Sequence, residues 1–389
     1  MINTEHCRAT PRMKAVASAL RRAGCSVTLL ACSGHACSGA GMPVLHWQAL
    51  PALPGPPGVA GAFGGMDNGS LIVAGGSNFQ PGPDEDLWSA PKLWHKECYV
   101  LRDPASAAPQ WSRAGTLSEA RGNGASASSP QGLVCLGGDD GVSLTRRAFL
   151  LRWVEGALQE QGLPDLPVAA SCGSAAVIGR TVYYLTGQIG SGLETADPRF
   201  WSLELPADGR PHNGAEWTAL PPLPGGGRAF AALVAQNNGR EICLYAIGGR
   251  RASSGEGTTA KIEPLREVHA YSPSENRWRR CSDAPVAIMA APVIPFGSSQ
   301  ILVLGGDDGA LMARTAELKS AHPGFPRRAY VYDTISDRWD DAGQTPANQV
   351  AAVTGAAGEQ IFVATGEVKP RHRTTAAWRV TASPAAPHD

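Results

Sequence analysis

The stretch LIVAGG, residues 71–76, decides the fold of this chain, because variants of it return along the sequence. Three further copies keep both glycines: LVCLGG at 133–138, LYAIGG at 244–249 and ILVLGG at 301–306. Two weaker copies keep one glycine each: YYLTG at 183–187 and IFVATG at 361–366. Successive copies lie about 50 to 60 residues apart, a spacing typical of repeats that each form a four-stranded unit.

Each copy is followed by a second apolar stretch and then by an outer strand that a tryptophan or its substitute opens. The second stretches lie at 98–101, 148–151, 200–203, 268–271, 330–333 and 377–380, and the outer strands carry Trp111, Leu158, Trp217, Trp278 and Trp339. The sixth tryptophan is missing after Trp378 and is found near the start of the chain, as Trp47. The sequence therefore predicts an all-β, six-bladed propeller over residues 43–381, whose last blade the N-terminal strand closes, with a tail at 382–389.

Each residue type in the repeat has a physical reason. We expect the apolar runs to be the inner strands, because strands between neighbouring blades are covered on both faces. Glycines allow backbones to approach closely where the strands converge. The large outer-strand tryptophan is expected to cover the seam between blades.

Composition excludes several classes of protein. The chain has 389 residues, a formal net charge of zero, and no cluster of Lys and Arg interleaved with aromatic residues, so nucleic-acid binding is not expected. No apolar run reaches the roughly 18 residues of a transmembrane helix. With 46 glycines, 31 prolines and little helical periodicity, the composition favours a β-rich fold with many turns.

The first 41 residues differ from the rest. Lys14, Arg21 and Arg22 precede a short apolar segment and Cys32, an arrangement that resembles a bacterial export signal with a lipoprotein-type cysteine. Periplasmic or lipid-anchored export is slightly favoured on this basis. The alternative is a disordered or spurious leader, with Met42 as the true start and a cytoplasmic protein.

The five cysteines beyond this segment are scattered singly, at Cys98, Cys135, Cys172, Cys243 and Cys281. Their spacing indicates neither a zinc site nor a disulfide framework, so we expect free, buried thiols.

The stretch GEVKPRHRT, residues 366–374, concentrates chemistry as no other part of the chain does. Glu367 is a candidate general base, and Arg373 could keep it ionised or hold a substrate, because arginine binds carboxylates in a bidentate fork. The alternative for an arbitrary Glu and Arg at this spacing is a salt bridge that only holds a loop. His95 and His372 are possible proton carriers.

The glycine-pair, aromatic and tryptophan pattern resembles the kelch repeat, and the 366–374 loop resembles that of the N-acetylneuraminate epimerases, the bacterial sialic acid mutarotases. The turn AGGSNF at 74–79 and the insert up to Lys96 are also similar to that family, as are Arg121 and Arg228. In well-known members the Glu-Lys-Pro loop lies in mid-chain. Its place in the last blade of this chain suggests a circularly permuted branch of the family.

The resemblance implies an isomerase that interconverts the α and β anomers of N-acetylneuraminate, with Glu367 and Arg373 as the catalytic residues and no metal or cofactor. Arg121 and Arg228 would suit the carboxylate of this sugar acid, and the sequence leaves open which arginine binds it. Further substrate contacts are expected from residues near the glycine turns and in the insert: Asn78, Asp139, Gln188, Asp307 and His95. The four residues Glu367, Arg373, Arg121 and Arg228 should then converge on one ligand. The sequence leaves the oligomeric state open.

Each of these residues could instead have a purely structural role. Arg121 and Arg228 could be strand-start residues that bond carbonyls of a neighbouring blade, and His95 could be structural. The acidic pairs 139–140 and 307–308 are more typical of loop residues that cap backbone amides than of metal ligands. The run 250–251 is expected to be solvated surface.

Two other functions remain open. One is a non-catalytic kelch module that binds a glycan or a protein partner, which the fold alone would equally allow. The other, more distant, is a copper radical oxidase on a kelch-type ring. The scattered histidines do not favour it.

Overall fold

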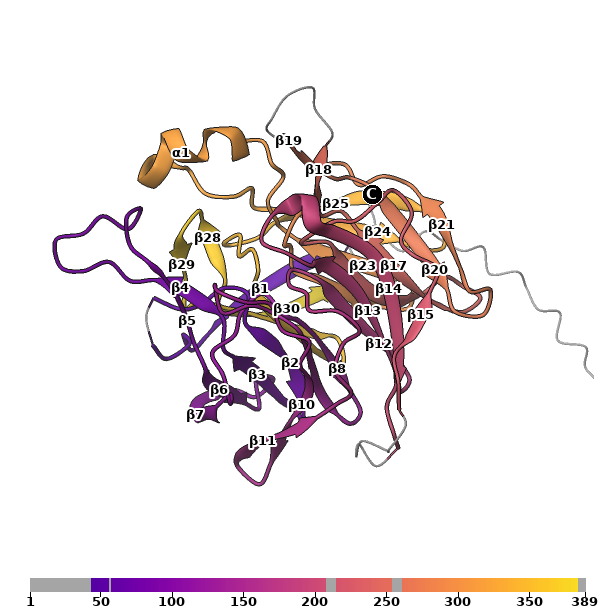
Figure 1. The fold of residues 1–389 in the computed structure, drawn as a ribbon, viewed down its shortest axis with the longest axis horizontal. Helices are drawn as coiled ribbons and strands as arrows, with labels where there is room; N and C mark the ends of the chain where they lie inside the picture. The colour runs from indigo at the N-terminus through magenta and orange to yellow at the C-terminus, as the bar shows by residue number, and fades with distance from the viewer. Residues whose placement is uncertain (1–42, 56, 208–214, 254–260, 384–389) are drawn as a thin grey trace, which may run out of the picture. The chain divides into compact units, whose positions relative to one another are not determined.

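The computed structural model describes residues 43–55, 57–207, 215–253 and 261–383. These residues form six four-stranded antiparallel sheets, the blades of a six-bladed β-propeller (Figure 1). The predicted all-β fold is confirmed. The signal-like segment and residues 384–389 of the predicted tail lie outside the described residues, whereas residues 382 and 383 belong to the last strand, β30 (Ala377–Ser383).

The blades follow one another along the chain, and their strands run in sequence order from the axis outward. Blade 1 contains, from its innermost strand, β2 (Phe63–Asp67), β3 (Ser70–Ala74), β6 (Glu97–Arg102) and β7 (Gln110–Thr116). Blade 2 contains β8 (Ala125–Ser129), β9 (Gly132–Leu136), β10 (Ala148–Val154) and β11 (Ala157–Gly162). Blade 3 contains β12 (Ser174–Ile178), β13 (Thr181–Gln188), β14 (Ala196–Glu204) and β15 (Thr218–Leu220).

The remaining blades repeat this order, except for the outermost strand of the last. Blade 4 contains β16 (Ala232–Asn237), β17 (Ile242–Ile247), β20 (Val268–Ser272) and β21 (Arg277–Cys281). Blade 5 contains β22 (Val293–Phe296), β23 (Gln300–Leu304), β24 (Arg328–Asp333) and β25 (Arg338–Gln344). Blade 6 contains β26 (Val353–Ala357), β27 (Gln360–Ala364), β30 (Ala377–Ser383) and, outermost, β1 (Val44–Leu50).

Blade 6 joins the two ends of the propeller. Strand β1 pairs with β30 along its whole length, from Val44 opposite Ser383 to Leu50 opposite Ala377. Trp47 packs edge-on against Trp378, with ring centroids 6.4 Å apart. Closure by the N-terminal strand is thus confirmed, and it pairs an edge that would otherwise be open to another chain.

Six residues with positive φ close the propeller at its axis. They are Gly61, Asn123, Cys172, Phe230, Ala290 and Ala351, each just before an innermost strand, and we call them the axial ring. The backbone N–H of each donates to the carbonyl of the preceding member, as from Asn123 to Gly61 at 2.7 Å. Gly61 donates to Ala351 at 2.9 Å, which completes the circle. The innermost strands of all six blades then line a channel of about 470 Å³.

The place of the apolar runs corrects one expectation. The glycine-ended runs are the second strands of the blades, as in β3 and β9, whose residues are all buried. Several innermost strands are instead rich in small residues, as in ASASS of β8 and VTGAA of β26. A second strand has neighbours on both sides and both faces, whereas an innermost strand borders the crowded axial channel, so small side chains fit there.

Tryptophans of the outermost strands fasten the seams, as predicted. The indole N–H groups of Trp111, Trp217, Trp278 and Trp339 donate to carbonyls that follow the outermost strand of the preceding blade. These acceptors are Pro51, Pro164, Pro221 and Ser282, at 2.8 to 3.1 Å. Each side chain therefore covers apolar surface and also satisfies a backbone carbonyl.

The remaining elements lie in segments that are inserted after the glycine turns (Figure 1). Three hairpins are β4 (Ser77–Phe79) with β5 (Lys92–Trp94), β18 (Arg250–Ser253) with β19 (Lys261–Pro264), and β28 (Glu367–Lys369) with β29 (His372–Arg373). Short helical turns are η1 (Leu193–Thr195), η2 (Met312–Arg314), α1 (Thr315–Leu318) and η3 (Lys319–Ala321). No helix among the described residues is long and apolar enough to cross a membrane. The five cysteines from Cys98 onward are free, as expected.

Candidate active site

The glycine turns bring one residue from each blade to an equivalent place beside the axial ring. Each of these residues exchanges two backbone hydrogen bonds with the residue just before an axial-ring member, as Glu367 does with Val350 at 2.9 Å. The six residues, which we call the mouth positions, are Ser77, Asp139, Gln188, Arg250, Asp307 and Glu367. Four of the residues singled out in the sequence therefore lie at this level. Asn78 lies one residue beyond it, and Arg250 was missed.

Glu367 and Arg373 form an ion pair across the hairpin β28–β29. The two residues are direct cross-strand neighbours, and Arg373 Nη1 lies 2.8 Å from Glu367 Oε2. The guanidinium is 5% exposed and the carboxylate 20%. Arg373 Nε also donates to the carbonyl of Ser77 at 3.1 Å, so the arginine ties blade 6 to blade 1.

The turn of this hairpin is shaped by Arg371. This residue has a φ of 69°, and its backbone N–H donates to Glu367 Oε1. Its guanidinium stacks over Phe79, 4.1 Å from the ring centroid, and donates to the carbonyls of Trp88 and Ala90. The inserted segment that carries β4 and β5 thus packs directly on the loop that carries Glu367. This packing and the N–H of Arg371 together fix the orientation of the carboxylate.

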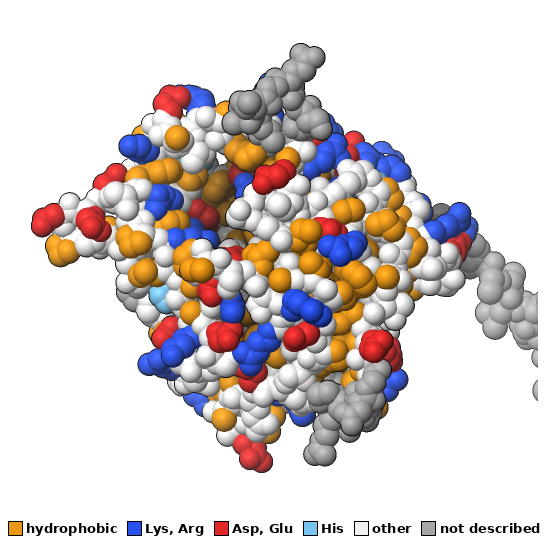
Figure 2. Space-filling view, in the orientation of Figure 1, with side chains coloured by type: hydrophobic (Ala, Val, Ile, Leu, Met, Phe, Trp, Pro, Cys, Tyr) orange, Lys and Arg blue, Asp and Glu red, His pale blue; other side chains and the backbone are white. Residues whose placement is uncertain are grey.

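A cavity of about 300 Å³ opens beside Glu367. It is lined by Arg250, Asp307, Met312, Thr315, His322, Phe325, Glu367 and Pro370. In Figure 2 the surface is hollowed between the segment that carries α1 and the hairpin β18–β19, and side chains of both charges lie in its wall. Three mouth positions therefore share one cavity with a partly apolar wall, a composition suited to a small polar ligand.

Two ionisable groups of this cavity have shifted pKa values. Burial raises the pKa of Asp307, although the Gly309 N–H, which donates to the carboxylate at 2.9 Å, opposes the shift. Burial lowers the pKa of His322. His322 Nδ1 accepts the N–H of Gly324 at 3.1 Å, which leaves Nε2 to carry the proton of the neutral ring.

Lys92 and Asp139 both contact Trp94. Asp139 accepts hydrogen bonds from Trp94 Nε1 at 3.0 Å and Asn123 Nδ2 at 2.9 Å. Lys92 stacks on Trp94, with Nζ 4.7 Å from the ring centroid. Burial and the charge of Arg373 lower the pKa of Lys92, while Asp139 and Glu367 oppose that shift. The cation therefore lies within electrostatic reach of the Glu367–Arg373 pair.

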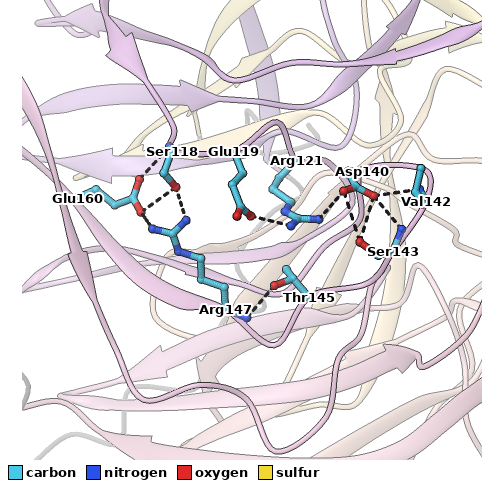
Figure 3. Close-up of polar contacts among 9 residues, drawn as sticks. All are labelled: Ser118, Glu119, Arg121, Asp140, Val142, Ser143, Thr145, Arg147 and Glu160. Atoms are coloured by element: carbon cyan, nitrogen blue, oxygen red, sulfur yellow. Dashed lines mark hydrogen bonds and ion pairs between the residues drawn. The ribbon is translucent and has the colours of Figure 1, made fainter.

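Arg121 is held by acidic neighbours of its own (Figure 3). Its guanidinium is 13% exposed and lies 2.6 Å from Glu119 and 3.3 Å from Asp140. Hydrogen bonds from the backbone N–H groups of Ser143 and Val142 lower the pKa of Asp140 and hold it in place. Arg121 is not among the residues that line the cavity of Glu367.

Arg228 has no exposed side-chain surface. Its guanidinium lies 2.7 Å from Glu267 and donates to the carbonyls of Gly248 and Pro224, both at 3.2 Å. Pro224 lies, like Arg228 itself, in the connection that leads to β16 of blade 4, and Gly248 follows β17 of the same blade. The expected convergence of four residues on one ligand is thus only half present: Glu367 and Arg373 meet, whereas Arg121 and Arg228 each pair with other carboxylates.

Four further candidates lie near the mouth. Asn78 is buried, and its amide donates to the carbonyl of Gly58 at 3.0 Å. Gln188 is 9% exposed at its mouth position. His95 lies 3.7 Å from Glu97, and its Nε2 is buried without a hydrogen-bond partner. His372 Nδ1 is 3.0 Å from the carbonyl of Pro370 in the turn of the hairpin.

The acidic pairs cap turns, as predicted. Asp140 accepts from the N–H groups of Val142 and Ser143, and Asp308 accepts from that of Ala310. Among the described residues, no group of three or more His, Cys, Asp or Glu side chains is placed to hold a metal ion.

Arg250 corrects the expectation that residues 250–251 are solvated surface. Its guanidinium stacks on Phe230 of the axial ring, 4.7 Å from the ring centroid, and it lines the cavity. The signal was present in the repeat: Arg250 follows Gly248 and Gly249 as Glu367 follows Gly366. Lys92 and His322 lie in segments that are inserted between the strands of a blade, where the sequence repeat does not predict the position of a residue.

Comparison with known proteins gives curated relatives named N-acetylneuraminate epimerase. No protein-family model matches the chain. A curated N-acetylneuraminate epimerase from Yersinia enterocolitica is 26% identical over 240 residues, 56% of either chain. Another from Haemophilus influenzae (strain PittEE) is 25% identical over 237 residues, 55% of this chain and 58% of the relative. A third, from Escherichia coli O9:H4, is 27% identical over 266 residues, 61% of this chain and 66% of the relative.

The chain therefore matches little more than half of the length of the first of these curated relatives. A solved structure titled "Structure of YjhT" superposes with a TM-score of 0.58 at 14% identity, and the match covers 86% of this chain and 99% of that one. At this identity the likeness supports the fold. The resemblance to kelch repeats and the circular permutation stay predictions.

Proposed function

We propose that the chain is a mutarotase that interconverts the α and β anomers of N-acetylneuraminate by general acid–base catalysis at the mouth of the propeller. The observation that carries the proposal is the Glu367–Arg373 ion pair beside a cavity of about 300 Å³. The curated relatives named N-acetylneuraminate epimerase support the substrate.

Glu367 would act as the general base. It would take the proton of the anomeric hydroxyl while the ring oxygen gains a proton, which opens the ring to the keto form. Rotation about the bond to the carbonyl carbon and closure on its other face return the opposite anomer. Asp307 lines the same cavity, and burial raises its pKa, so we assign it as the proton donor to the ring oxygen.

Arg373 would position Glu367. Its guanidinium is almost fully buried and already bound to the carboxylate and to the Ser77 carbonyl, which restricts the carboxylate to one orientation. Because mutarotation proceeds spontaneously in water, a positioned base and acid suffice, and each contributes about 10²- to 10⁴-fold.

Proton NMR of freshly released α-N-acetylneuraminate tests the proposal. With the protein present we expect the β anomer to appear faster than in buffer, and with Glu367→Gln to appear about 10²- to 10⁴-fold more slowly than with the wild-type protein. No acceleration by the wild-type protein would contradict the proposal. Tight sugar binding without acceleration would instead favour the non-catalytic glycan-binding module.

A further inference from the structure

We infer that Arg250 binds the carboxylate of the sugar acid, an inference that rests on the proposed function. The site requires a cation that can receive this group, because the substrate is an anion at neutral pH. Arginine suits it, since the planar guanidinium matches a carboxylate with two parallel N–H···O bonds.

The other arginines near the mouth are already occupied. Arg373 binds Glu367, Arg121 binds Glu119 and Asp140, and Arg228 binds Glu267. Each of these three also has a buried guanidinium nitrogen without a hydrogen-bond partner, as Arg250 has at Nε. What distinguishes Arg250 is that its side chain makes no hydrogen bond or ion pair with any other residue in the described part of the chain and stacks only on Phe230. The side chain is half-buried, so its charge is partly removed from water with no carboxylate paired to it, and binding of an anion there would be favourable.

The fold holds Arg250 in place without using the N–H groups of its guanidinium. Its backbone exchanges two hydrogen bonds of 2.9 Å with Ala229. Its guanidinium rests on Phe230, whose own backbone is fixed by the axial ring. Neither the backbone hydrogen bonds nor the stacking uses the N–H groups of the guanidinium, so these groups can donate to a ligand.

The position of Arg250 also fits the chemistry. In N-acetylneuraminate the carboxylate is attached to the anomeric carbon, the carbon that reacts. Arg250, Glu367 and Asp307 line the same cavity of about 300 Å³. A carboxylate bound by Arg250 would therefore hold the anomeric carbon in the same cavity as the proposed base and the proposed acid.

The neighbouring acidic groups leave Arg250 available. Asp307 is close enough for the charge of Arg250 to lower its pKa, but burial outweighs this effect and the pKa of Asp307 is raised. The two side chains form no ion pair. Glu367 is held by Arg373 and by the N–H of Arg371.

Isothermal titration calorimetry with two sugars tests the inference. N-acetylneuraminate carries the carboxylate, and its methyl ester has the same ring without the charge. We expect the wild-type protein to bind the acid about 10- to 100-fold more tightly than the ester, the range of a hydrogen-bonded charged pair. Arg250→Gln should bind both sugars equally weakly.

Arg251→Gln is the matched control. The neighbouring guanidinium is held by Glu263 at 2.8 Å and Glu267 at 3.1 Å and does not line the cavity. This variant should keep the preference for the acid. Thermal unfolding of both variants checks that they are folded.

The outcomes separate the inference from the proposed function. A preference for the acid that depends on Arg250, without any acceleration of mutarotation, would contradict the function and support the inference. Acceleration of mutarotation together with equal binding of the acid and the ester would support the proposed function and contradict the inference. A preference that survives in Arg250→Gln, or no binding of the acid by the wild-type protein, would overturn the inference.

Discussion

Two Glu–Arg ion pairs in this propeller have nearly the same geometry and different surroundings. The Glu367–Arg373 distance is 2.8 Å and the Glu267–Arg228 distance 2.7 Å, and the two carboxylates are 20% and 19% exposed. Glu267 also lies 3.1 Å from Arg251 and 3.6 Å from Arg280. Glu367 has one guanidinium, one backbone N–H and a cavity. Distance and burial therefore do not distinguish the two pairs, whereas the incompletely surrounded carboxylate beside a cavity is found only at Glu367 of these two pairs.

The position of each pair in its blade also separates a structural pair from a candidate site. Arg228 donates to the carbonyl of Gly248, the first residue of the glycine turn in blade 4. In blade 6 the amide of Gln349 donates to the carbonyl of Thr365, the equivalent residue. A neutral amide thus does in one blade what the guanidinium does in another, which indicates that Arg228 fastens its blade. Glu367 lies at a mouth position.

The largest expected effect is that of Glu367→Gln. The amide keeps the size of the carboxylate but cannot take a proton, so turnover followed by NMR should fall about 10²- to 10⁴-fold. Glu267→Gln is the matched variant in the other pair and should leave turnover per folded molecule unchanged. Equal losses of turnover in both variants would remove the distinction between the two pairs.

Next in size is Arg228→Met. Loss of the guanidinium leaves the Gly248 and Pro224 carbonyls without a donor and deprives Glu267 of its nearest partner. We expect the free energy of unfolding in urea to fall by about 3 kcal/mol, with little change in sugar affinity. A stable variant with weakened binding of the sugar acid would show instead that Arg228 is a substrate ligand, as the sequence suggested.

Arg373→Lys should have a smaller effect. Lysine keeps the charge but loses the planar fork that reaches both Glu367 and the carbonyl of Ser77. We expect kcat to fall about 10- to 100-fold, with KM changed less, because the substrate carboxylate is assigned to Arg250. If KM rose and kcat stayed constant, Arg373 would bind substrate directly.

The smallest effect at neutral pH comes from His269, beside the Arg228–Glu267 pair. Burial, with the charges of Arg228 and Arg280, lowers its pKa to about 4. The unfolded chain therefore binds a proton that the folded chain does not, so stability falls as the pH drops below about 6.5. The loss should reach about 2 kcal/mol at pH 5.

His269→Leu should remove this part of the pH dependence, as measured by urea denaturation at pH 7.5 and pH 5. Arg228→Met should reduce it, since one of the charges that lower the pKa is gone. An unchanged difference between the two pH values in His269→Leu would assign the acid sensitivity to other groups.

The repeat made much of the fold predictable. Paired glycines and outer tryptophans recur in the sequence, and the absence of a tryptophan after Trp378 pointed to Trp47 and β1. The order of strands within a blade was not predictable in the same way. The apolar runs stand out as strands, but the small-residue strands nearest the axis, such as β8, carry no hydrophobic pattern to mark them.

The site was predictable in part, where register could be counted. Glu367, Asp139, Gln188 and Asp307 follow the glycine turns directly. Arg250 follows them too, but beside Arg251 it resembled a solvated charge run. Successive residues of a strand point to opposite faces, so one guanidinium stacks on Phe230 and the other pairs with Glu263.

The sequence by itself determined the six repeats, the closing strand and the loop that carries Glu367 and Arg373, because these depend on local pattern and spacing. Only the tertiary structure decided which charges are paired and which remain available. Arg228 meets a carboxylate 39 residues away, and Arg371 a carbonyl 283 residues away. Electrostatic interactions depend on distance and burial in space, and a one-dimensional pattern contains neither.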